Sequence, residues 1–302
     1  MMFRGQEIKL DHFEPCIHRG AKRRVKCCSQ WICRLHNTDC RLRRHDDAPN
    51  LLACNECDDK EVQYNSISQT ADSISKLMVP LTAVTSLNPN PLRKDRQLKC
   101  LLSWLNVGIE VLAVNTSEEL DSMPWLNGIT EQFVSNETAT AYDRPVQKVS
   151  SLIRAGMLTG CQFMLINSDI EINGDVSILS DAIESQERLT IGVRYNYESG
   201  ASRESARRET AGLDVFVMTP EIAARIPSRE FGIGKPAWDY WLPHQVRLNG
   251  VKFNWIQRPL FFHESHQLGW SNNDWKIGHD MILRDYGISI TQGNFRKNLR
   301  SW

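Results

Sequence analysis

Short apolar runs alternate with amphipathic segments along the chain after residue 77. Residues 78–86 (MVPLTAVTS) are rich in β-branched side chains and predict a buried strand, and residues 109–115 (IEVLAVN) predict another. Between them, residues 93–107 carry leucines at helical spacing and end before Gly108, which predicts a helix. These leucines are Leu98, Leu101, Leu102 and Leu105. The order strand, helix, strand predicts a βαβ crossover in a parallel sheet.

The alternation continues as far as a short helix expected from Pro220. Further strands are expected at 163–167, 189–193 and 213–218, and the apolar positions of another helix are Val146, Val149, Leu152 and Ile153. Residues 195–212 (YNYESGASRESARRETAG) are too polar to pack and predict a mobile loop. The pattern therefore predicts an α/β fold with a Rossmann-type, mostly parallel sheet flanked by helices.

Composition narrows the class of protein. The 302 residues include 36 basic and 36 acidic side chains, and this balance argues against a surface built to bind nucleic acid or anionic lipid. No apolar run approaches the roughly 18 residues that cross a bilayer, and the N-terminus lacks the apolar core of a secretory signal. We therefore expect a soluble, cytoplasmic protein without a membrane span.

Seven of the nine cysteines fall within the first 57 residues, where thiols and imidazoles recur at short spacing. The candidate ligands are Cys16, His18, Cys27, Cys28, Cys33, His36, Cys40, Cys54 and Cys57. Such pairs can aim two soft ligands at one tetrahedral ion, and zinc would stabilise a segment with too few apolar residues to fold alone. An iron–sulfur cluster and unligated or redox-active thiols are the alternatives. We expect a zinc module at 1–62, a linker at 63–77 and the main domain at 78–302.

Residues 1–44 are basic, with eleven Lys or Arg against four acidic residues. One interpretation is a zinc module that binds nucleic acid or phosphate. The favoured interpretation is a solvated basic face that is offset by the acidic residues that follow, because the spacing does not fit the Cys2His2 finger.

The candidate chemistry begins at the end of the strand expected at 163–167. Ligands bind at the carboxyl ends of strands in open α/β sheets, and Asp169 follows this strand by two residues. The alternative is that Asp169 only caps the following turn. The surrounding strands and helix (TAVTSLN, RQLKCLLSWLNVG, EVLAVNT, FMLINSDI) resemble the nucleotide-sugar glycosyltransferases of GT-A fold. The later stretches GLDVFVMTP, FGIGKPAWDYWLP and PLFFHESHQLGW are similar to uncharacterised nucleotide-diphospho-sugar transferases, and CIHRG and CRLHNTDC to a small module ahead of some bacterial members.

The resemblance, over about residues 78–270, implies a site for a divalent cation, Mn²⁺ or Mg²⁺. In the family an Asp-x-Asp motif holds the cation on the donor diphosphate, and Asp169 is its matching ligand. A late histidine completes the site, with His263 as the matching position and His266 as the second choice. The motif here is Asn167-Ser168-Asp169, so the usual first carboxylate is absent. A histidine hydrogen-bonded in the core is the alternative for His263.

A base must accept the proton of the attacking hydroxyl, and Asp239 in PAWDYW is the candidate. Trp238 and Trp241 would shield Asp239 from water, raise its pKa and offer faces to a sugar ring, with core packing as the alternative for these tryptophans. Asp239 as the N-cap of a helix is the alternative. Asp214, inside an apolar strand, is expected to touch a sugar or to pair with Arg194.

Donor contacts are expected at strand ends and from basic side chains. The candidates are Thr85, Ser86, Asn115, Asn167, Lys148, Arg154, Arg203, Arg207 and Arg208, with surface solvation as the alternative for the basic residues. The resulting hypothesis is a metal-assisted, hexosyltransferase-like enzyme that uses a UDP- or GDP-sugar and a saccharide or other hydroxyl acceptor. A catalytically weak GT-A-like protein whose zinc module docks a protein or nucleic acid is the alternative, and a metal-dependent hydrolase is a third option.

Overall fold

The structure is a computed structural model, and it describes residues 2–3, 6–7, 80–184, 187–209, 212–266, 269–287 and 289. The chain divides into two compact units, residues 1–72 and 73–302. In the first unit the described residues form a short antiparallel pair, β1 (Met2–Phe3) and β2 (Gln6–Glu7). The nine candidate zinc ligands lie outside the described residues, so the zinc module and its linker stay predictions.

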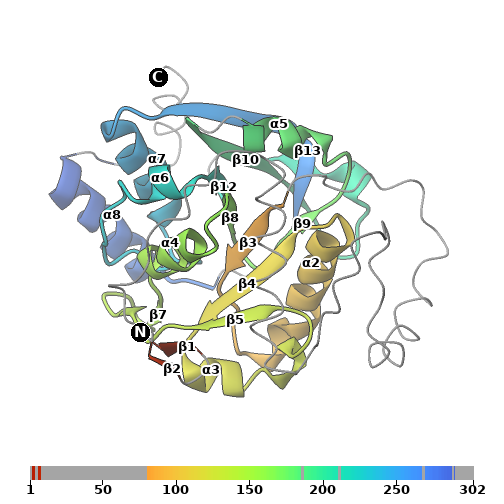
Figure 1. Ribbon diagram of the computed structural model, residues 1–302, viewed down its shortest axis with the longest axis horizontal. Coiled ribbons are helices and arrows are strands. Elements are labelled where there is room, and N and C mark those ends of the chain that lie inside the picture. Colours follow the sequence, from red (N-terminus) through yellow and green to blue (C-terminus); the bar gives the residue numbers. More distant parts are fainter. Residues whose placement is uncertain are drawn as a thin grey trace, which may run out of the picture. The chain divides into compact units, whose positions relative to one another are not determined.

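The second unit is built on one large sheet (Figure 1). Along this sheet the strand order is β5, β4, β3, β8, β12, β10, β13 and β9, and β11 pairs with β10. The strands are β3 (Thr82–Thr85), β4 (Glu110–Asn115), β5 (Glu131–Val134), β8 (Phe163–Ile166), β9 (Ile170–Ile172), β10 (Arg188–Tyr197), β11 (Arg207–Arg208), β12 (Val215–Met218) and β13 (Lys252–Glu264). A separate hairpin consists of β6 (Thr138–Ala139) and β7 (Val146–Gln147).

Half of the large sheet is parallel. Strands β5, β4, β3 and β8 run parallel, as the βαβ pattern predicts, whereas β12 is antiparallel to both β8 and β10. Strand β13 is parallel to β10, and β9 is antiparallel to β13. The expectation of a mostly parallel sheet is therefore corrected to a mixed one. Parallel neighbours need a long crossover, usually a helix, and the described part of the connection from β10 to β12 contains no α-helix.

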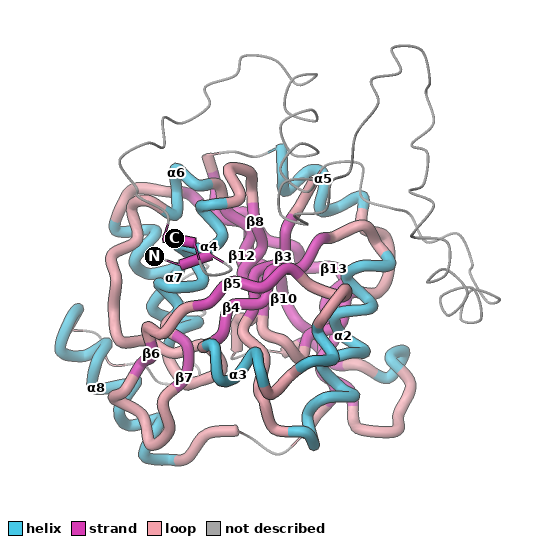
Figure 2. The backbone as a smooth tube through the Cα atoms, turned by 60° about the horizontal axis from the view of Figure 1, so that its bottom comes forward, coloured by secondary structure: helices cyan, strands magenta, loops and turns pink. Residues whose placement is uncertain are grey.

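Helices cover both faces of the sheet (Figure 2). The α-helices are α2 (Lys94–Asn106), α3 (Ser117–Asp121), α4 (Val149–Leu158), α5 (Ser177–Glu184), α6 (Pro220–Ala223), α7 (Trp238–Leu248) and α8 (Asn272–Tyr286). Three 3-10 turns accompany them, η3 (Pro91–Arg93), η4 (Pro124–Leu126) and η5 (Arg203–Ser205). Helix α2 lies on one side, against β4 and β9, and α4 lies on the other, against β3, β4 and β8.

Two helices show how local chemistry fixes the fold. Trp104 of α2 is fully buried, and its Nε1 donates to the carbonyl of Ile170 at 2.7 Å, which fastens the helix to β9. Ser271 caps α8 through a capping box with Asp274, and Gly287 ends the helix in the left-handed conformation. The hydrogen bond from Trp104 therefore fixes the start of β9, directly after residues 167–169, against α2.

Most expected elements form, and two expectations are corrected. Val146 lies in β7, and α4 begins at Val149, because the chain at Val146 pairs with β6 before it turns. The polar stretch 195–212, expected to be a mobile loop, contains the end of β10, η5 and β11 in its described part. Its polar side chains find partners far away in sequence, which a local pattern does not reveal. Among the described helices, none has the length and apolar character needed to cross a membrane.

Candidate active site

The turn between β8 and β9 carries Asn167, Ser168 and Asp169, whose side chains point to three different partners. Asn167 Nδ2 donates to Asp214 Oδ1, and Ser168 Oγ donates to Gln97 Oε1 at 3.1 Å. Asp169 Oδ2 faces two histidines instead. The Asn and Ser thus anchor the turn, and Asp169 supplies the carboxylate of the site.

Asp169, His263 and His266 form a compact group at the carboxyl end of the parallel strands. His266 Nε2 lies 3.0 Å and His263 Nε2 lies 3.5 Å from Asp169 Oδ2, and the two Nε2 atoms are 3.3 Å apart. The three side chains are partly exposed, at 29% for Asp169, 13% for His263 and 15% for His266. The structure thus brings both histidines considered from the sequence next to the predicted carboxylate.

The donor set fits a divalent cation. Within the described part of the chain, one potential ligand atom from each of the three residues lies within 4.8 Å of the others. Two imidazoles and a carboxylate suit Mn²⁺, Fe²⁺ or Zn²⁺ better than Mg²⁺, which prefers oxygen ligands. Burial would raise the pKa of Asp169, but the hydrogen bonds and charges of the two histidines outweigh it and hold that pKa well below its usual range. The carboxylate is therefore ionised at neutral pH and ready to bind a cation.

Arg93 contacts the second nitrogen of His266. Its Nη1 lies 2.9 Å from His266 Nδ1, and a guanidinium only donates, so Nδ1 accepts. A neutral His266 then carries its proton on Nε2 and donates to Asp169. Ligation through Nε2 requires the other tautomer, so Arg93 must release this contact when a cation binds. By contrast, His263 Nδ1 is buried without a hydrogen-bond partner among the described residues.

Arg194, on β10, pairs with the carboxylate of Asp214, the residue before β12, and approaches that of Glu209. Its Nη1 forms an ion pair with Asp214, which is 5% exposed, and its Nη2 lies 3.4 Å from Glu209. Burial would lower the pKa of Arg194, but the charges of Asp214, Glu209, Asp169 and Asp239 raise it. Asp214 therefore pairs with Arg194, which confirms one of the two alternatives for this residue.

Asp239 lies in the first turn of α7, half-buried. Its Oδ2 accepts a hydrogen bond from the backbone of Leu213 at 3.0 Å. Burial and the neighbouring charge of Asp214 raise the pKa of Asp239 to about 7. The N-cap alternative is wrong, because the N-cap position belongs to Ala237. A carboxyl group with this pKa can exchange a proton near neutral pH, as a general base must.

The two tryptophans expected to face a sugar are core residues. Trp238 is 2% exposed and meets Phe216 edge to face at 5.4 Å, and Trp241 is 0% exposed and stacks on Phe231 at 4.9 Å. Neither ring presents a free face, so the interpretation as a sugar platform is corrected. Core packing, the alternative for these tryptophans, accounts for both rings.

The strand-end candidates for donor binding are mostly buried. Thr85 and Asn115 are 0% exposed, whereas Ser86 is half-buried. Asn115 accepts from the Leu87 amide at 2.9 Å and donates to the Leu87 carbonyl at 2.8 Å, so its carboxamide holds the turn after β3. Asn115 thus shapes this edge, and Ser86 is the candidate with accessible surface.

The basic candidates for phosphate contact have carboxylate or amide partners. Arg154 binds Glu137 with both guanidinium ends, at 2.6 and 3.1 Å. Lys148 pairs with Glu230, Arg203 with Glu171, and Arg208 donates to Gln257 at 3.1 Å. These contacts engage the basic side chains of four candidates, and the fifth, Arg207, is exposed.

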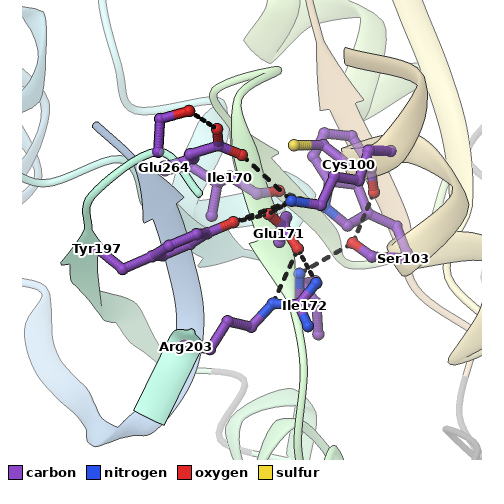
Figure 3. A network of polar contacts seen from close by, with 11 residues as sticks. Cys100, Ser103, Ile170, Glu171, Ile172, Tyr197, Arg203 and Glu264 are labelled. Carbon is purple, nitrogen blue, oxygen red and sulfur yellow. Dashed lines mark hydrogen bonds and ion pairs between the residues drawn. The ribbon is translucent and has the colours of Figure 1, made fainter. Parts of the chain in front are cut away.

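Glu171 is the centre of a polar network that the sequence did not predict (Figure 3). It is 2% exposed on β9 and accepts from Tyr197 and Arg203, with Lys99 Nζ at 2.8 Å. Lys99 also lies 3.2 Å from Glu264, the residue after His263. The network therefore ties α2, β10 and η5 to β9, which begins directly after Asp169, and to β13, which carries His263. The sequence Ile-Glu-Ile after Asp169 could have indicated this network. A charged side chain between two buried isoleucines needs polar partners inside the protein.

Comparisons with known proteins leave the family open. No protein-family model and no curated protein match the chain. Among solved structures, the chain is similar to S. aureus TarS 1-349 in complex with UDP-GlcNAc, at 10% identity and a TM-score of 0.46, over 73% of this chain and 70% of that one. The same fragment with UDP gives 12% identity, a TM-score of 0.45 and coverages of 73% and 69%. Another S. aureus TarS structure is 11% identical, with a TM-score of 0.43, over 73% of this chain and 42% of that one. These values are too low to assign the chain to a family.

Proposed function

We propose that this protein is a glycosyltransferase that moves a sugar from a nucleotide-sugar donor to an acceptor hydroxyl, assisted by a divalent cation. The observation that carries the proposal is the group of Asp169, His263 and His266 at the carboxyl end of the parallel strands. The charges of Asp169 and of Asp239, a carboxyl group with a raised pKa, both act on Arg194. Such strand ends form the ligand crevice of open α/β sheets.

Asp169, His263 and His266 would hold the cation. When bound, a divalent cation stabilises the negative charge of the departing diphosphate. Arg93 approaches the same group through His266 and supplies a second positive charge beside it. The lone carboxylate of the Asn167-Ser168-Asp169 turn is thus supplemented by two imidazoles.

Asp239 would act as the base. As the acceptor oxygen bonds to the anomeric carbon, the bond from that carbon to the diphosphate breaks, and the acceptor proton passes to the Asp239 carboxylate. The Leu213 amide at 3.0 Å orients the carboxylate, and the Asp214 charge keeps its proton affinity high enough for this role.

Binding is tested by thermal shift on the full chain, with Mn²⁺ and UDP- or GDP-sugars separately and together. UDP-GlcNAc is the first donor to try, because TarS was solved with it. We expect the largest stabilisation when cation and donor are both present, and its loss in Asp169→Ala. The matched control is Asp181→Ala, which removes an exposed carboxylate from α5. Stabilisation by no nucleotide sugar would contradict the proposal.

Turnover is tested by following donor consumption and product formation. Asp239→Asn should bind donor normally and transfer sugar at least about a hundredfold more slowly, since a general base contributes 10²–10⁴-fold. Unchanged transfer in both Asp169→Ala and Asp239→Asn would exclude this site. Donor binding without turnover would favour the binding-protein alternative, and release of free sugar whatever acceptor is supplied would favour a hydrolase.

The zinc module and the cytoplasmic location are separate proposals. Elemental analysis of the purified protein should show zinc, held by the cysteine-rich segment that precedes residue 58. This zinc should persist in His263→Ala, because thiolates bind it independently of the Asp169 group. Protein without zinc or iron would contradict the module.

A further inference from the structure

Ala237 adopts a left-handed backbone conformation. Its φ is +80°, the single positive value outside glycine in the described part of the chain, and it is 1% exposed. Left-handed backbone is unfavourable for residues with a Cβ, and it persists only where the surroundings impose it. Ala237 is the N-cap of α7, and its carbonyl accepts from Trp241 N at 2.8 Å, so this turn fixes where α7 begins. Asp239 follows two residues later.

Helix α8 lies directly against this turn. A Cβ added to Gly278 would lie 2.6 Å from the Pro236 carbonyl oxygen and 2.8 Å from Ala237 Cβ. Real Cβ atoms do not approach backbone so closely, so only glycine allows α8 this near. The close approach leaves the turn at 236–237 no room to move toward α8.

A buried ion pair holds the same turn from its other end. Lys235 Nζ lies 2.8 Å from Asp274 Oδ2, and the two side chains are 5% and 2% exposed. Asp274 also accepts from the amides of Ser271 at 3.0 Å and Asp143 at 3.1 Å. Lys235 Nζ further lies 5.7 Å from the ring centre of Tyr142. One carboxylate thus joins the segment before α7, the start of α8 and the loop after β6.

We propose that Lys235, Asp274 and Gly278 are positioning residues that impose the left-handed turn at Ala237 and thereby place the carboxylate of Asp239 against Leu213. The inference rests on the proposed function, because it assigns these residues to the reaction through Asp239. A buried ion pair contributes little net stability, so the role that we assign to Lys235 and Asp274 is to specify one conformation of the turn at Ala237. A turn in an unfavourable backbone conformation needs surrounding contacts that impose it, and this turn lies two residues from the proposed base.

The first test compares two glycine variants. Gly278→Ala pushes on Pro236 and Ala237, whereas the control Gly156→Ala, in α4, meets Phe163 at 2.3 Å and disturbs the core elsewhere. We expect Gly278→Ala to lower kcat by about ten- to a hundredfold with little change in KM, because small misplacements of a reacting group are costly. Gly156→Ala should lower Tm while kcat stays within about twofold. Equal losses of kcat in the two variants would overturn the proposal.

The second test reads the Asp239 carboxyl group directly, by 13C NMR titration of Asp-labelled protein with the Asp239 signal assigned from Asp239→Asn. The charged and titratable groups that act on Asp239 include Asp214, Arg194 and Tyr142, and neither glycine variant changes them. Gly278→Ala should lower the titration midpoint from about 7 by about one pH unit, as the carboxyl group gains solvent. A midpoint that moves no more than in Gly156→Ala would overturn the proposal.

The third variant removes the ion pair without leaving a buried charge. Lys235→Met combined with Asp274→Leu replaces both groups by apolar ones, which buried pairs commonly tolerate. We expect this double variant to fold and to show the same lower kcat and lower Asp239 titration midpoint as Gly278→Ala. A wild-type kcat together with a wild-type midpoint would overturn the proposal. The titration separates the two proposals. If the wild-type protein transfers no sugar, the proposed function fails. A shift of the Asp239 titration midpoint that is confined to the positioning variants still supports their action on Asp239.

Discussion

Arg93 Nη1 donates to His266 Nδ1 at 2.9 Å, so a positive charge holds this imidazole in the tautomer that disfavours metal ligation through Nε2. The contact joins the turn after β3 to the chain after β13, segments 173 residues apart in sequence. It places Arg93 where it opposes a bare cation and favours an anionic donor.

Replacing Arg93 should therefore have opposite effects on two ligands. Arg93→Ala is expected to bind Mn²⁺ alone about tenfold more tightly, because a nearby like charge is removed. It should bind a nucleotide sugar in the presence of Mn²⁺ more weakly. Isothermal titration with each ligand measures both, and Arg188→Ala, an exposed arginine at the start of β10, is the control. Parallel changes in the two affinities would contradict this role.

Asp214 should set the pH dependence of transfer. Its negative charge is the second cause, after burial, that raises the pKa of Asp239 to about 7. A base works when ionised, so activity should fall as pH drops through this value. Asp214→Asn removes the repulsion and frees Arg194 to attract Asp239, so the acid limb of kcat/KM should move to lower pH. An acid limb that stays in place or moves upward would show that Asp239 is not the titrating base.

Asp239 should also cost stability at high pH. A carboxyl group whose pKa is raised in the folded state binds its proton more tightly there than in the unfolded chain, so folding is weakened as pH rises from about 4 to above 7. Asp239→Asn should therefore raise the free energy of unfolding at pH 8 by about 1–2 kcal/mol, a value reduced for solvent screening of a half-buried group. At pH 4 the variant and wild type should be equal. Urea unfolding at both pH values checks this, and a gain that is equal at both would refute the linkage.

Ala237 should tolerate glycine, unlike a helical alanine. Ala237→Gly relieves an unfavourable left-handed conformation, so stability should be unchanged or higher by up to about 1 kcal/mol. Ala223→Gly, at an equally buried helical position in α6, should lose about 1 kcal/mol. Thermal unfolding compares the pair. A clear loss in Ala237→Gly would mean that the conformation at 237 is not strained.

The sequence predicted the parallel half of the sheet from short-range signals, and it singled out Asp169, His263 and His266, which lie together in the structure. Apolar runs predicted β3, β4 and β8, and the end of β8 pointed to Asp169. The histidines came from the resemblance to GT-A glycosyltransferases, at the stretch FFHESH. The direction of β12 was not predictable from apolar character, since parallel and antiparallel buried strands look alike in a single sequence. The same limit applies to β7, whose pairing with β6 overrode a helical spacing.

The site residues that were missed depend on contacts distant in sequence. Arg93 and His266 are joined only by folding, and Glu171 acquires Lys99, Tyr197 and Arg203 from three other elements. The expectation that Trp238 and Trp241 offer faces to a sugar was wrong. The sequence does not show whether an indole next to a candidate base faces solvent or the core. Their neighbours Phe216 and Phe231 decide the matter, and no spacing rule reveals them.

The surroundings of Arg194 bear on the order in which ligands arrive. Four carboxyl groups, of Asp214, Glu209, Asp169 and Asp239, act on the Arg194 guanidinium, so negative charge gathers around this one side chain. A nucleotide sugar is itself an anion, and these carboxylates repel it until a cation binds among them. We therefore expect compulsory-order kinetics in which the cation enters first, and high ionic strength, by screening the repulsion, should relax that order.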